Sequence, residues 1–348
     1  MTGTTFKSLI LAKHPKTNIV PGETFKLITN PIFTTDDLKD GQVLLETLYI
    51  SIDPAMRGWI DEGSTSYRPS VEISVKIGDI MAGVVIANVL ASKASTISVG
   101  QKVFTFNAGW AELAITDAAN VTVINLPSGS KLTDSLGILG FSGLCAYFGL
   151  VNEAEVKAGD FVVVSGAAGA IGTAACQIAL LKGAKVLGTV GTDDKINYLK
   201  DLGCDALNYK DKDFAKKFEE KTDGLLINIF FDNVGGKILD LALSRAKPHA
   251  RFILCGATSL YNSGNTAIIE NYLDIIFKSV RLQGYFMNKY ANKFAVTTEI
   301  LAQWLAEGKL KRSETIVKGG LAVAEEALAG IFTGTNTGKM LVQVKEEN

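Results

Sequence analysis

Residues 161–172, FVVVSGAAGAIG, decide the fold because they join an apolar strand to a glycine-rich turn. The first five are predicted to form a buried strand, and the run AIGTAACQIALLKG from Ala170 onward a helix. Between them Ala167, Gly169 and Gly172 form a G-x-G-x-x-G loop with alanine in its first place. Glycine lets the backbone approach a pyrophosphate and the helix press on the strand, and the first helical N–H groups then bind the phosphates. The alternative is an ordinary strand–turn–helix connection with small residues for packing.

Strands and helices alternate after this loop, which weakens that alternative. A second strand is predicted at 185–190 and a helix at 193–202. Further short strands are predicted near 206–209, 225–232, 251–255 and 280–284. Such alternation implies right-handed crossovers and a parallel sheet. The sequence therefore predicts an α/β fold with a Rossmann doubly wound sheet, a dinucleotide-binding domain over residues 126–310.

The N-terminal region, residues 1–125, has a different sequence pattern. Short β-like runs are separated by Gly, Pro, Asn and Asp turns, which indicates an antiparallel barrel or sandwich. These runs are 43–50, 80–89, 102–106, 112–116 and 120–124. The tail holds a helix-like stretch, a GTNTGK turn and the strand MLVQV, which we expect to return to the N-terminal sheet. Residues 1–125 and 311–348 would then form one domain, with the nucleotide domain inserted.

Composition and charge limit the classes of function. The length of 348 residues suggests two domains, and 35 basic against 36 acidic side chains give no electrostatic footprint for nucleic acid. No segment has the apolar length of a membrane span. The opening MTGTTFKSLILAKHPK lacks a signal-peptide pattern and the final KEEN is no targeting address, so a cytoplasmic protein is expected.

The cysteines and histidines argue against zinc. The cysteines are Cys145, Cys176, Cys204 and Cys255, and the histidines are His14 and His249. No C-x-x-C pair occurs, and these residues supply neither the three clustered ligands of catalytic zinc nor the four of structural zinc, so no metal site is predicted. We expect all four cysteines to be small buried residues. No G-x-S-x-G elbow occurs either, which argues against a serine hydrolase.

The residues that follow the second predicted strand bear on the choice of nicotinamide cofactor. An acid there binds the ribose of NAD, whereas cations accept the 2′-phosphate of NADP. The expected acid position falls on Gly191 or Thr192, so the carboxylate is missing. Lys195, one helical turn further on, and Tyr209, ending the third strand, are candidate phosphate ligands. The alternative is that Lys195 is a solvated lysine and Asp193 only caps a helix; the residues favour NADP.

Eight short motifs carry a resemblance to a known family over nearly the whole chain. They are SIDPAMRGW (51–59), AGW (108–110), GFSGLCAYFGL (140–150), SGAAGAIG (165–172), FDNVGG (231–236), CGATSLYN (255–262), LQGYF (282–286) and TNTGK (335–339). The chain resembles the zinc-independent branch of the medium-chain dehydrogenase/reductase superfamily, in the group of leukotriene dehydrogenase/prostaglandin reductase, plant alkenal double-bond reductases and bacterial curcumin reductase. The resemblance implies a GroES-like N-terminal domain, a Rossmann domain, NADPH and a homodimer. Members of the group reduce the carbon–carbon double bond of α,β-unsaturated aldehydes and ketones.

The resemblance also assigns roles to residues of this chain. The cofactor-binding residues that it implies are Gly166, Ala168, Gly169, Ala170, Ile171, Gly172, Thr192, Lys195, Tyr209, Asn233, Cys255, Gly256, Ala257, Thr258, Ser259, Tyr285, Phe286 and Asn336. Tyr261 occupies the position of a family tyrosine beside the nicotinamide ribose and the substrate, and is the catalytic candidate. The candidates for the substrate pocket are Ala55, Arg57, Trp59 and Tyr67. Trp59 and Tyr67 could instead be ordinary packing residues. Arg57 could instead anchor its loop or bind a diphosphate oxygen.

Two positions depart from the family pattern. Ala55 stands where relatives commonly have tyrosine, so the wall of the substrate pocket is expected to be reshaped. Cys145 stands where many relatives have threonine near the nicotinamide, and a thiol is the weaker hydrogen-bond donor.

The mechanism that follows is hydride transfer to the β-carbon of an enone or enal. The charge then moves to the carbonyl oxygen, where Tyr261 and the cofactor ribose are the expected donors, and a proton reaches the α-carbon from Tyr261 or water. A packing role for Tyr261 without proton transfer is equally open. Rival functions are NADPH-dependent reduction of a carbonyl to an alcohol, quinone reduction, and non-catalytic NADPH binding.

Overall fold

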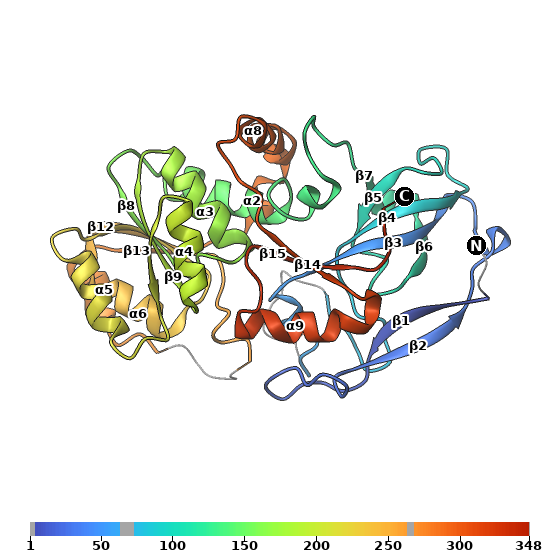
Figure 1. Cartoon of the computed structure of the whole chain (residues 1–348), viewed down its shortest axis with the longest axis horizontal. Helices are drawn as coiled ribbons and strands as arrows, with labels where there is room; N and C mark the ends of the chain where they lie inside the picture. The colour runs from blue at the N-terminus through green and yellow to red at the C-terminus, as the bar shows by residue number, and fades with distance from the viewer. Residues whose placement is uncertain (1–3, 63–72, 263–267, 348) are drawn as a thin grey trace. The chain divides into compact units, whose positions relative to one another are not determined.

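The computed structural model of the protein describes residues 4–62, 73–262 and 268–347. The chain forms two compact units, each assembled from separate stretches of sequence (Figure 1). Unit 1 comprises Met1–Leu126, Thr315–Thr335 and Met340–Asn348, and unit 2 comprises Pro127–Glu314 and Asn336–Lys339. Among the described helices, none is both long and apolar enough to cross a membrane.

Unit 2 is built on a six-stranded sheet whose strand pairs are all parallel. In spatial order the strands are β10 (Asp205–Asn208), β9 (Lys185–Val190), β8 (Phe161–Val164), β11 (Ile227–Asp232), β12 (Ala246–Leu254) and β13 (Arg281–Gly284). Counted along the chain from β8, this is the order 3-2-1-4-5-6 of a dinucleotide-binding sheet. The predicted Rossmann-type fold is confirmed.

Both faces of this sheet are buried, as the apolar strand sequences require. Successive side chains of a strand point to opposite faces. Val162 and Val164 of β8 lie in one apolar core with helices α2 and α3, while Val163 lies in a second core with α5 and α6. Phe231 and Phe230 of β11 divide between the same two cores. A central parallel strand therefore reads as an unbroken apolar run because each face meets helices.

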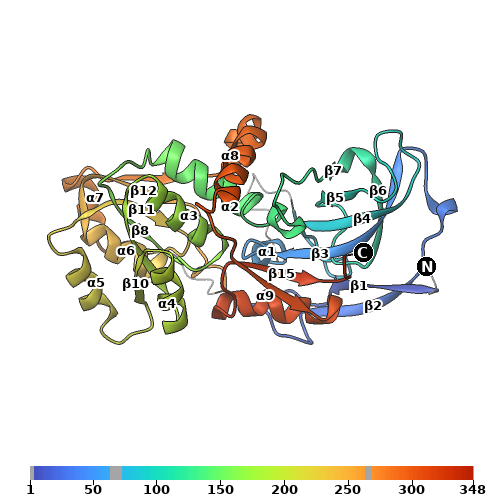
Figure 2. The same ribbon diagram turned by 45° about the horizontal axis from the view of Figure 1, so that its top comes forward.

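The helices of unit 2 cover these two faces. They are α2 (Phe141–Tyr147), the π-helix η5 (Phe148–Glu153), α3 (Ala170–Leu181), α4 (Asp193–Asp201), α5 (Phe214–Thr222), α6 (Gly236–Ser244), α7 (Tyr272–Phe277), the 3-10 helix η6 (Met287–Lys293) and α8 (Phe294–Ala306). Another described 3-10 helix, η4 (Leu132–Ser135), precedes α2. Figures 1 and 2 show α2 and α3 side by side, and the two helices pack against each other. The helix predicted after the glycine loop is α3.

Unit 1 is mainly antiparallel β-structure, as predicted. A separate pair is formed by β1 (Thr5–Leu11) and β2 (Phe25–Pro31). The larger sheet contains β3 (Gln42–Ile52), β4 (Val85–Ser92), β5 (Lys102–Thr105), β6 (Leu113–Asp117), β7 (Val121–Val123), β14 (Glu314–Lys318) and β15 (Lys339–Gln343). Strand β15 runs antiparallel to β3, with Met340 opposite Ile52 and Val342 opposite Ile50. The expected return of the C-terminal strand to the N-terminal sheet is confirmed.

Unit 1 also corrects one predicted strand. The run 80–89 is not a single strand, because β4 begins only at Val85. Met81 lies in a connection whose backbone donates to Leu9 and accepts from Trp110. A side chain on Gly83 would lie 2.8 Å from the indole nitrogen of Trp110, so glycine is needed where the chain passes this ring. The α-helices among the described residues of unit 1 are the short α1 (Met56–Trp59) and α9 (Ala324–Thr333), with α9 packed on the β3 side of the core. Three described 3-10 helices are η1 (Thr35–Asp37), η3 (Ala118–Asn120) and η7 (Gly320–Val323).

Candidate functional site

The glycine loop between β8 and α3 has the geometry of a phosphate cradle. Gly166 has a positive φ of 58°, and α3 begins at Ala170 with Gly169 as its N-cap. A Cβ on Gly172 would lie 2.3 Å from the carbonyl oxygen of Gly166, so only glycine lets the helix press against the turn. At Gly169 a Cβ would come within 4 Å of one atom among the described residues, that same oxygen at 3.2 Å. The first N–H groups of α3 lack intrahelical partners and suit a pyrophosphate.

A second group of candidates lies where β9 and β10 end. Gly191 has no side chain, and a Cβ there would lie 2.9 Å from the hydroxyl of Tyr209. Lys195 is half-buried on the first turn of α4, and burial together with the positive charge of Lys210 lowers its pKa. The ammonium of Lys210 lies 5.9 Å from the ring centre of Tyr209. An anion between Lys195 and Lys210 would offset the repulsion between the two ammonium groups and the cost of burying the Lys195 charge. These residues therefore suit a 2′-phosphate. Lys210 was not predicted, although it directly follows Tyr209 in the sequence.

The carboxyl ends of β8 and β11 are held together by a buried carboxylate. Asp232 accepts hydrogen bonds from the Ser165 hydroxyl at 2.6 Å and from the backbone of Val234 and Gly235 at 3.0 Å, while burial raises its pKa. Asn233 in turn donates from its backbone to the Ser165 hydroxyl at 2.8 Å and from its amide to the Ser165 carbonyl at 2.7 Å. Asp232 therefore fixes Asn233 at the sheet edge where α/β sheets bind ligands. Sequence reasoning gave this aspartate no role of its own, although it lies inside the FDNVGG motif.

The predicted cofactor segment 255–259 begins at the same edge. The backbone N–H groups of Cys255 and Gly256 both donate to the Asp232 carbonyl, at 2.9 and 3.0 Å. Tyr261 turns back onto this segment, and its hydroxyl accepts a hydrogen bond from the N–H of Ala257 at 3.4 Å. Thr258 and Ser259 bond to the neighbouring 233–234 turn. Residues from two of the predicted motifs, FDNVGG and CGATSLYN, are thus brought together.

Tyr285, which follows β13, also lies at the carboxyl ends of the parallel strands. The Tyr285 N–H donates to the Leu254 carbonyl at 3.1 Å, and its hydroxyl donates to the Cys145 carbonyl of α2 at 3.2 Å. Burial raises the pKa of Tyr285 strongly, so it stays protonated. Phe286, by contrast, is 47% exposed. Three of the four cysteines are buried as expected, but Cys255 is partly exposed, because it stands where β12 leaves the core.

The TNTGK turn reaches the glycine loop. The N–H of Gly338 donates to the Ala168 carbonyl at 2.8 Å, and Gly169 and Gly338 form an isolated bridge. The amide of Asn336 donates to the Gly338 carbonyl at 2.7 Å, which shapes this turn. Asn336 is thereby held close to the predicted phosphate cradle.

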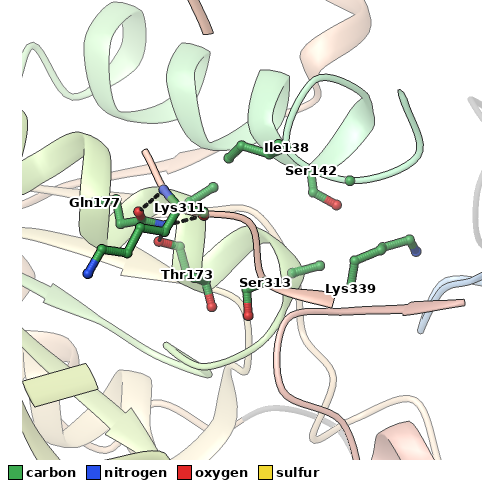
Figure 3. Close-up of a pocket in the computed structure, with 10 residues that line it drawn as sticks. Ile138, Ser142, Thr173, Gln177, Lys311, Ser313 and Lys339 are labelled. Carbon is green, nitrogen blue, oxygen red and sulfur yellow. Dashed lines mark hydrogen bonds between the residues drawn. The ribbon is translucent and has the colours of Figure 1, made fainter. Parts of the chain in front are cut away.

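A cavity of about 10 Å³ lies beside the first turns of α3 (Figure 3). Thr173, Ser313 and Lys339 are among its lining residues, and the side chain of Gln177 bonds to both the N–H and the carbonyl of Lys311. This volume holds about one water molecule. It is a packing detail beside the cradle and has no room for a substrate.

The substrate-pocket candidates of unit 1 have mixed surroundings. Arg57 is buried, and it donates to the carbonyls of Pro15 and Thr17 at 2.9 Å and pairs with Asp61. These contacts fit the loop-anchoring alternative. Trp59 lies in the core of unit 1, whereas Ala55 is exposed at the start of α1. Tyr67 lies outside the described residues.

Metal ligands do not cluster in the part of the chain that the structure describes. Within residues 4–62, 73–262 and 268–347, no group of three or more His, Cys, Asp or Glu side chains could hold a metal ion.

Comparison with known proteins connects this geometry to a family. Residues 7–124 match the family described as the N-terminal domain of oxidoreductase, and residues 170–305 match the family described as zinc-binding dehydrogenase. The chain is 35% identical to prostaglandin reductase 1 of Mus musculus, over 97% of this chain and 98% of the relative. It is 32% identical to the NADPH-dependent curcumin reductase of Escherichia coli, over 96% of each chain.

A solved crystal structure is also similar to this chain over nearly its whole length. The crystal structure of CurA from Vibrio vulnificus in complex with NADPH has a TM-score of 0.88 and 32% sequence identity, covering 98% of this chain and 100% of that one. Similarity of this extent means that the chain belongs to the medium-chain dehydrogenase/reductase superfamily, in the group of prostaglandin reductase 1 and curcumin reductase, and is an NADP-dependent oxidoreductase with NADPH as its cofactor.

Proposed function

We propose that this oxidoreductase uses NADPH to reduce the carbon–carbon double bond of α,β-unsaturated ketones and aldehydes. The observation that carries the proposal is the near full-length similarity to relatives named for prostaglandin and curcumin reduction. Curcumin contains double bonds conjugated to carbonyl groups, and conjugation makes the β-carbon electrophilic. Bound NADPH supplies the hydride that such a carbon accepts.

The protein's own part is to position two reactants and stabilise the negative charge on the carbonyl oxygen. Tyr261 is the proposed donor to that oxygen. Its support is local: the hydroxyl faces the backbone of Ala257 inside the predicted nicotinamide segment. The proton that reaches the α-carbon comes from Tyr261 or from water.

Product analysis tests the reaction class. An enone such as 4-phenyl-3-buten-2-one, incubated with NADPH and the protein, is expected to yield the saturated ketone, identified by mass and NMR. The allylic alcohol as main product would replace the proposal with carbonyl reduction. No NADPH oxidation across enones, enals and quinones would favour a non-catalytic NADPH-binding protein.

Single-turnover hydride transfer tests Tyr261. A positioned general acid adds about 10²–10⁴-fold, so Tyr261→Phe should slow the step by that factor while NADPH affinity stays near wild type. An unchanged rate would leave Tyr261 as a packing residue.

Lys195 is proposed to bind the 2′-phosphate together with Tyr209. Its support is the half-buried ammonium beside Lys210. A lost charge-assisted hydrogen bond costs about 1.5–3 kcal/mol, or roughly 10- to 150-fold in NADPH affinity. Lys195→Ala should therefore bind NADPH more weakly and NADH unchanged, and Lys200→Ala, an exposed lysine of the same helix, is the matched control. Equal weakening of both cofactors would contradict the assignment.

We also propose that the reaction needs no zinc, since the described residues offer no cluster of ligands. Activity should survive dialysis against a chelator, with metal content measured by mass spectrometry. Loss of activity that only zinc restores would contradict this.

A homodimer through β13 and α7 is proposed as the assembly. Strand β13 lies at the edge of its sheet, and among the described strands it pairs with β12 alone. The helix α7 just before it exposes Tyr272, Leu273, Ile276 and Phe277, each by 56% or more. An open strand edge beside an apolar helix suits a second copy of the chain. Light scattering should show a dimer that Phe277→Asp dissociates; a wild-type monomer would contradict the proposal.

A further inference from the structure

Two pairs of neighbouring thiols lie in unit 2, and they differ in exposure. The thiols of Cys145 and Cys255 are neighbours, and so are those of Cys176 and Cys204: in each pair the second thiol raises the pKa of the first. Cys176 and Cys204 are 0% and 3% exposed, in the core between α3 and the sheet. Cys145 is also buried, whereas Cys255 is partly exposed. One pair is therefore enclosed, and the other includes one partly exposed cysteine.

The backbone explains why Cys145 and Cys255 meet. Leu254 of β12 lies opposite Gly284 of β13, so the next residues, Cys255 and Tyr285, leave the two strands side by side. The Tyr285 hydroxyl reaches the carbonyl of Cys145 at 3.2 Å. The backbone of Cys145 in α2 is thereby tied to Tyr285, which follows β13 as Cys255 follows β12, and the Cys145 and Cys255 thiols are neighbours.

We propose that Cys145 and Cys255 form a redox-active dithiol, which a hydroperoxide oxidises to a disulfide at the edge of the cofactor segment. The inference goes beyond the proposed reduction of enones and does not depend on it. It differs from the expectation that all four cysteines are only small buried residues.

The reaction balances in two steps. The partly exposed Cys255 thiol gives up its proton and attacks the terminal peroxide oxygen, so that an S–O bond forms and the O–O bond breaks. The departing alkoxide takes up that proton and leaves as an alcohol (water for hydrogen peroxide), and Cys255 becomes a sulfenic acid. Cys145 then attacks the Cys255 sulfur, the S–S bond forms and the hydroxyl leaves as water with the Cys145 proton. Two thiols lose two electrons in total, and the hydroperoxide gains them. Cys145 suits the second role, because the neighbouring Cys255 thiol and burial raise its pKa and make it a poor first nucleophile.

The disulfide should weaken cofactor binding, because it forms at the start of the predicted cofactor segment. Cys255 opens the segment 255–259, and its N–H and that of Gly256 bond to the Asp232 carbonyl. A bond from Cys255 to α2 would pull on this segment. NADPH bound along the segment should in turn shield Cys255 from peroxide.

Peptide mapping under non-reducing conditions tests the inference in the full-length protein. The reduced protein is treated with hydrogen peroxide, free thiols are blocked with N-ethylmaleimide, and tryptic peptides are identified by mass. The expected product is a cross-linked peptide pair containing Cys145 and Cys255, lighter by two hydrogens than the sum, formed more slowly with NADPH present and reversed by dithiothreitol. Cys176 and Cys204 should stay out of the cross-link and be alkylated when the protein is denatured in the presence of the maleimide, as the internal control.

Variants separate the roles of the sulfurs. Cys145→Thr should abolish the cross-link and leave Cys255 oxidised singly, whereas Cys204→Ala should leave the cross-link intact. The inference is overturned if all four thiols survive a peroxide dose that oxidises glutathione, if wild-type Cys255 is overoxidised while Cys145 stays free, or if the Cys176–Cys204 pair cross-links as fast. The wild-type map decides the matter even if a variant fails to fold.

Discussion

Replacing each of two glycines of the cofactor loop by alanine should impair different properties, folding in one variant and cofactor binding in the other. At Gly172 the new Cβ would lie 2.3 Å from the Gly166 oxygen and 2.8 Å from the Ala167 Cα, both backbone atoms that cannot rotate away. At Gly169 it would approach the Gly166 oxygen at 3.2 Å, which a small shift relieves. Gly172→Ala should therefore damage folding, and Gly169→Ala mainly the approach of the pyrophosphate.

The expected magnitudes differ accordingly. Overpacking costs about 1–3 kcal/mol, and in a unit of this size each kcal/mol lowers the melting temperature by about 2–4 °C. Gly172→Ala should thus melt about 2–12 °C below wild type without cofactor. Gly169→Ala should melt within about 2 °C of wild type, yet bind NADPH at least about tenfold more weakly, as expected when one hydrogen bond to a charged group is lost.

Thermal unfolding by calorimetry and NADPH titration by fluorescence measure the two effects separately. The reasoning is refuted if Gly172→Ala melts like wild type, or if Gly169→Ala binds NADPH with undiminished affinity. The first result would mean that α3 can move away from the turn, and the second that no phosphate comes near Gly169.

Three further predictions concern charged groups. The Glu153 side chain is 6% exposed, and burial opposes its ionisation. Hydrogen bonds from Lys289, Tyr290 and Gln283 outweigh the burial and hold the pKa of Glu153 below its ordinary value of 4.5. The ionised carboxylate therefore stabilises the fold above about pH 4.5, and this contribution is lost as the pH falls through the pKa of the folded state. Glu153→Gln should flatten that part of the stability–pH curve measured by urea unfolding, and an unaltered curve would contradict this. Arg57→Met should destabilise unit 1 in the same assay by about 1–3 kcal/mol for each of the two carbonyls, of Pro15 and Thr17, that loses its donor. A total loss below about 1 kcal/mol would show that water replaces the guanidinium. Lys210→Ala should weaken NADPH binding by about 0.2–1 kcal/mol, at most about fivefold, since Lys210 is exposed; a loss as large as that of Lys195→Ala would make Lys210 the main phosphate ligand.

The order of elements in unit 2 could be predicted because its strands carry strong local signals. Strand β9 was predicted with its exact bounds, since an apolar run is bordered by Gly183 and Gly191. The fold class and the NADP-dependent activity are confirmed by the topology and the relatives. The cytoplasmic location stays a prediction, as do the roles of the individual site residues.

Weaker signals explain what was missed in unit 1. Strand β2 buries only Phe25, and its other side chains are exposed or intermediate, so no apolar alternation marks it. The run 80–89 looked continuous because Ile80 and Met81 are apolar, but their backbone bonds go to β1 and to Trp110 instead of β3. Such partners are fixed by tertiary contacts, which a local pattern does not contain.

The preference for NADP depends on two positions that constrain each other. An NAD-type acid at Gly191 would place its Cβ 2.9 Å from the Tyr209 hydroxyl and 3.1 Å from its Cζ, so the acid and the tyrosine compete for one space. Gly191→Asp alone should therefore displace Tyr209, repel the 2′-phosphate and weaken NADPH binding by tenfold or more, about 1.4 kcal/mol, while gaining little for NADH. Adding Tyr209→Ala should make room for the carboxylate to meet the 2′-hydroxyl and raise NADH affinity. Titration of both variants with both cofactors checks this, and tight NADH binding by Gly191→Asp alone would show that Tyr209 does not occupy the space of the acid.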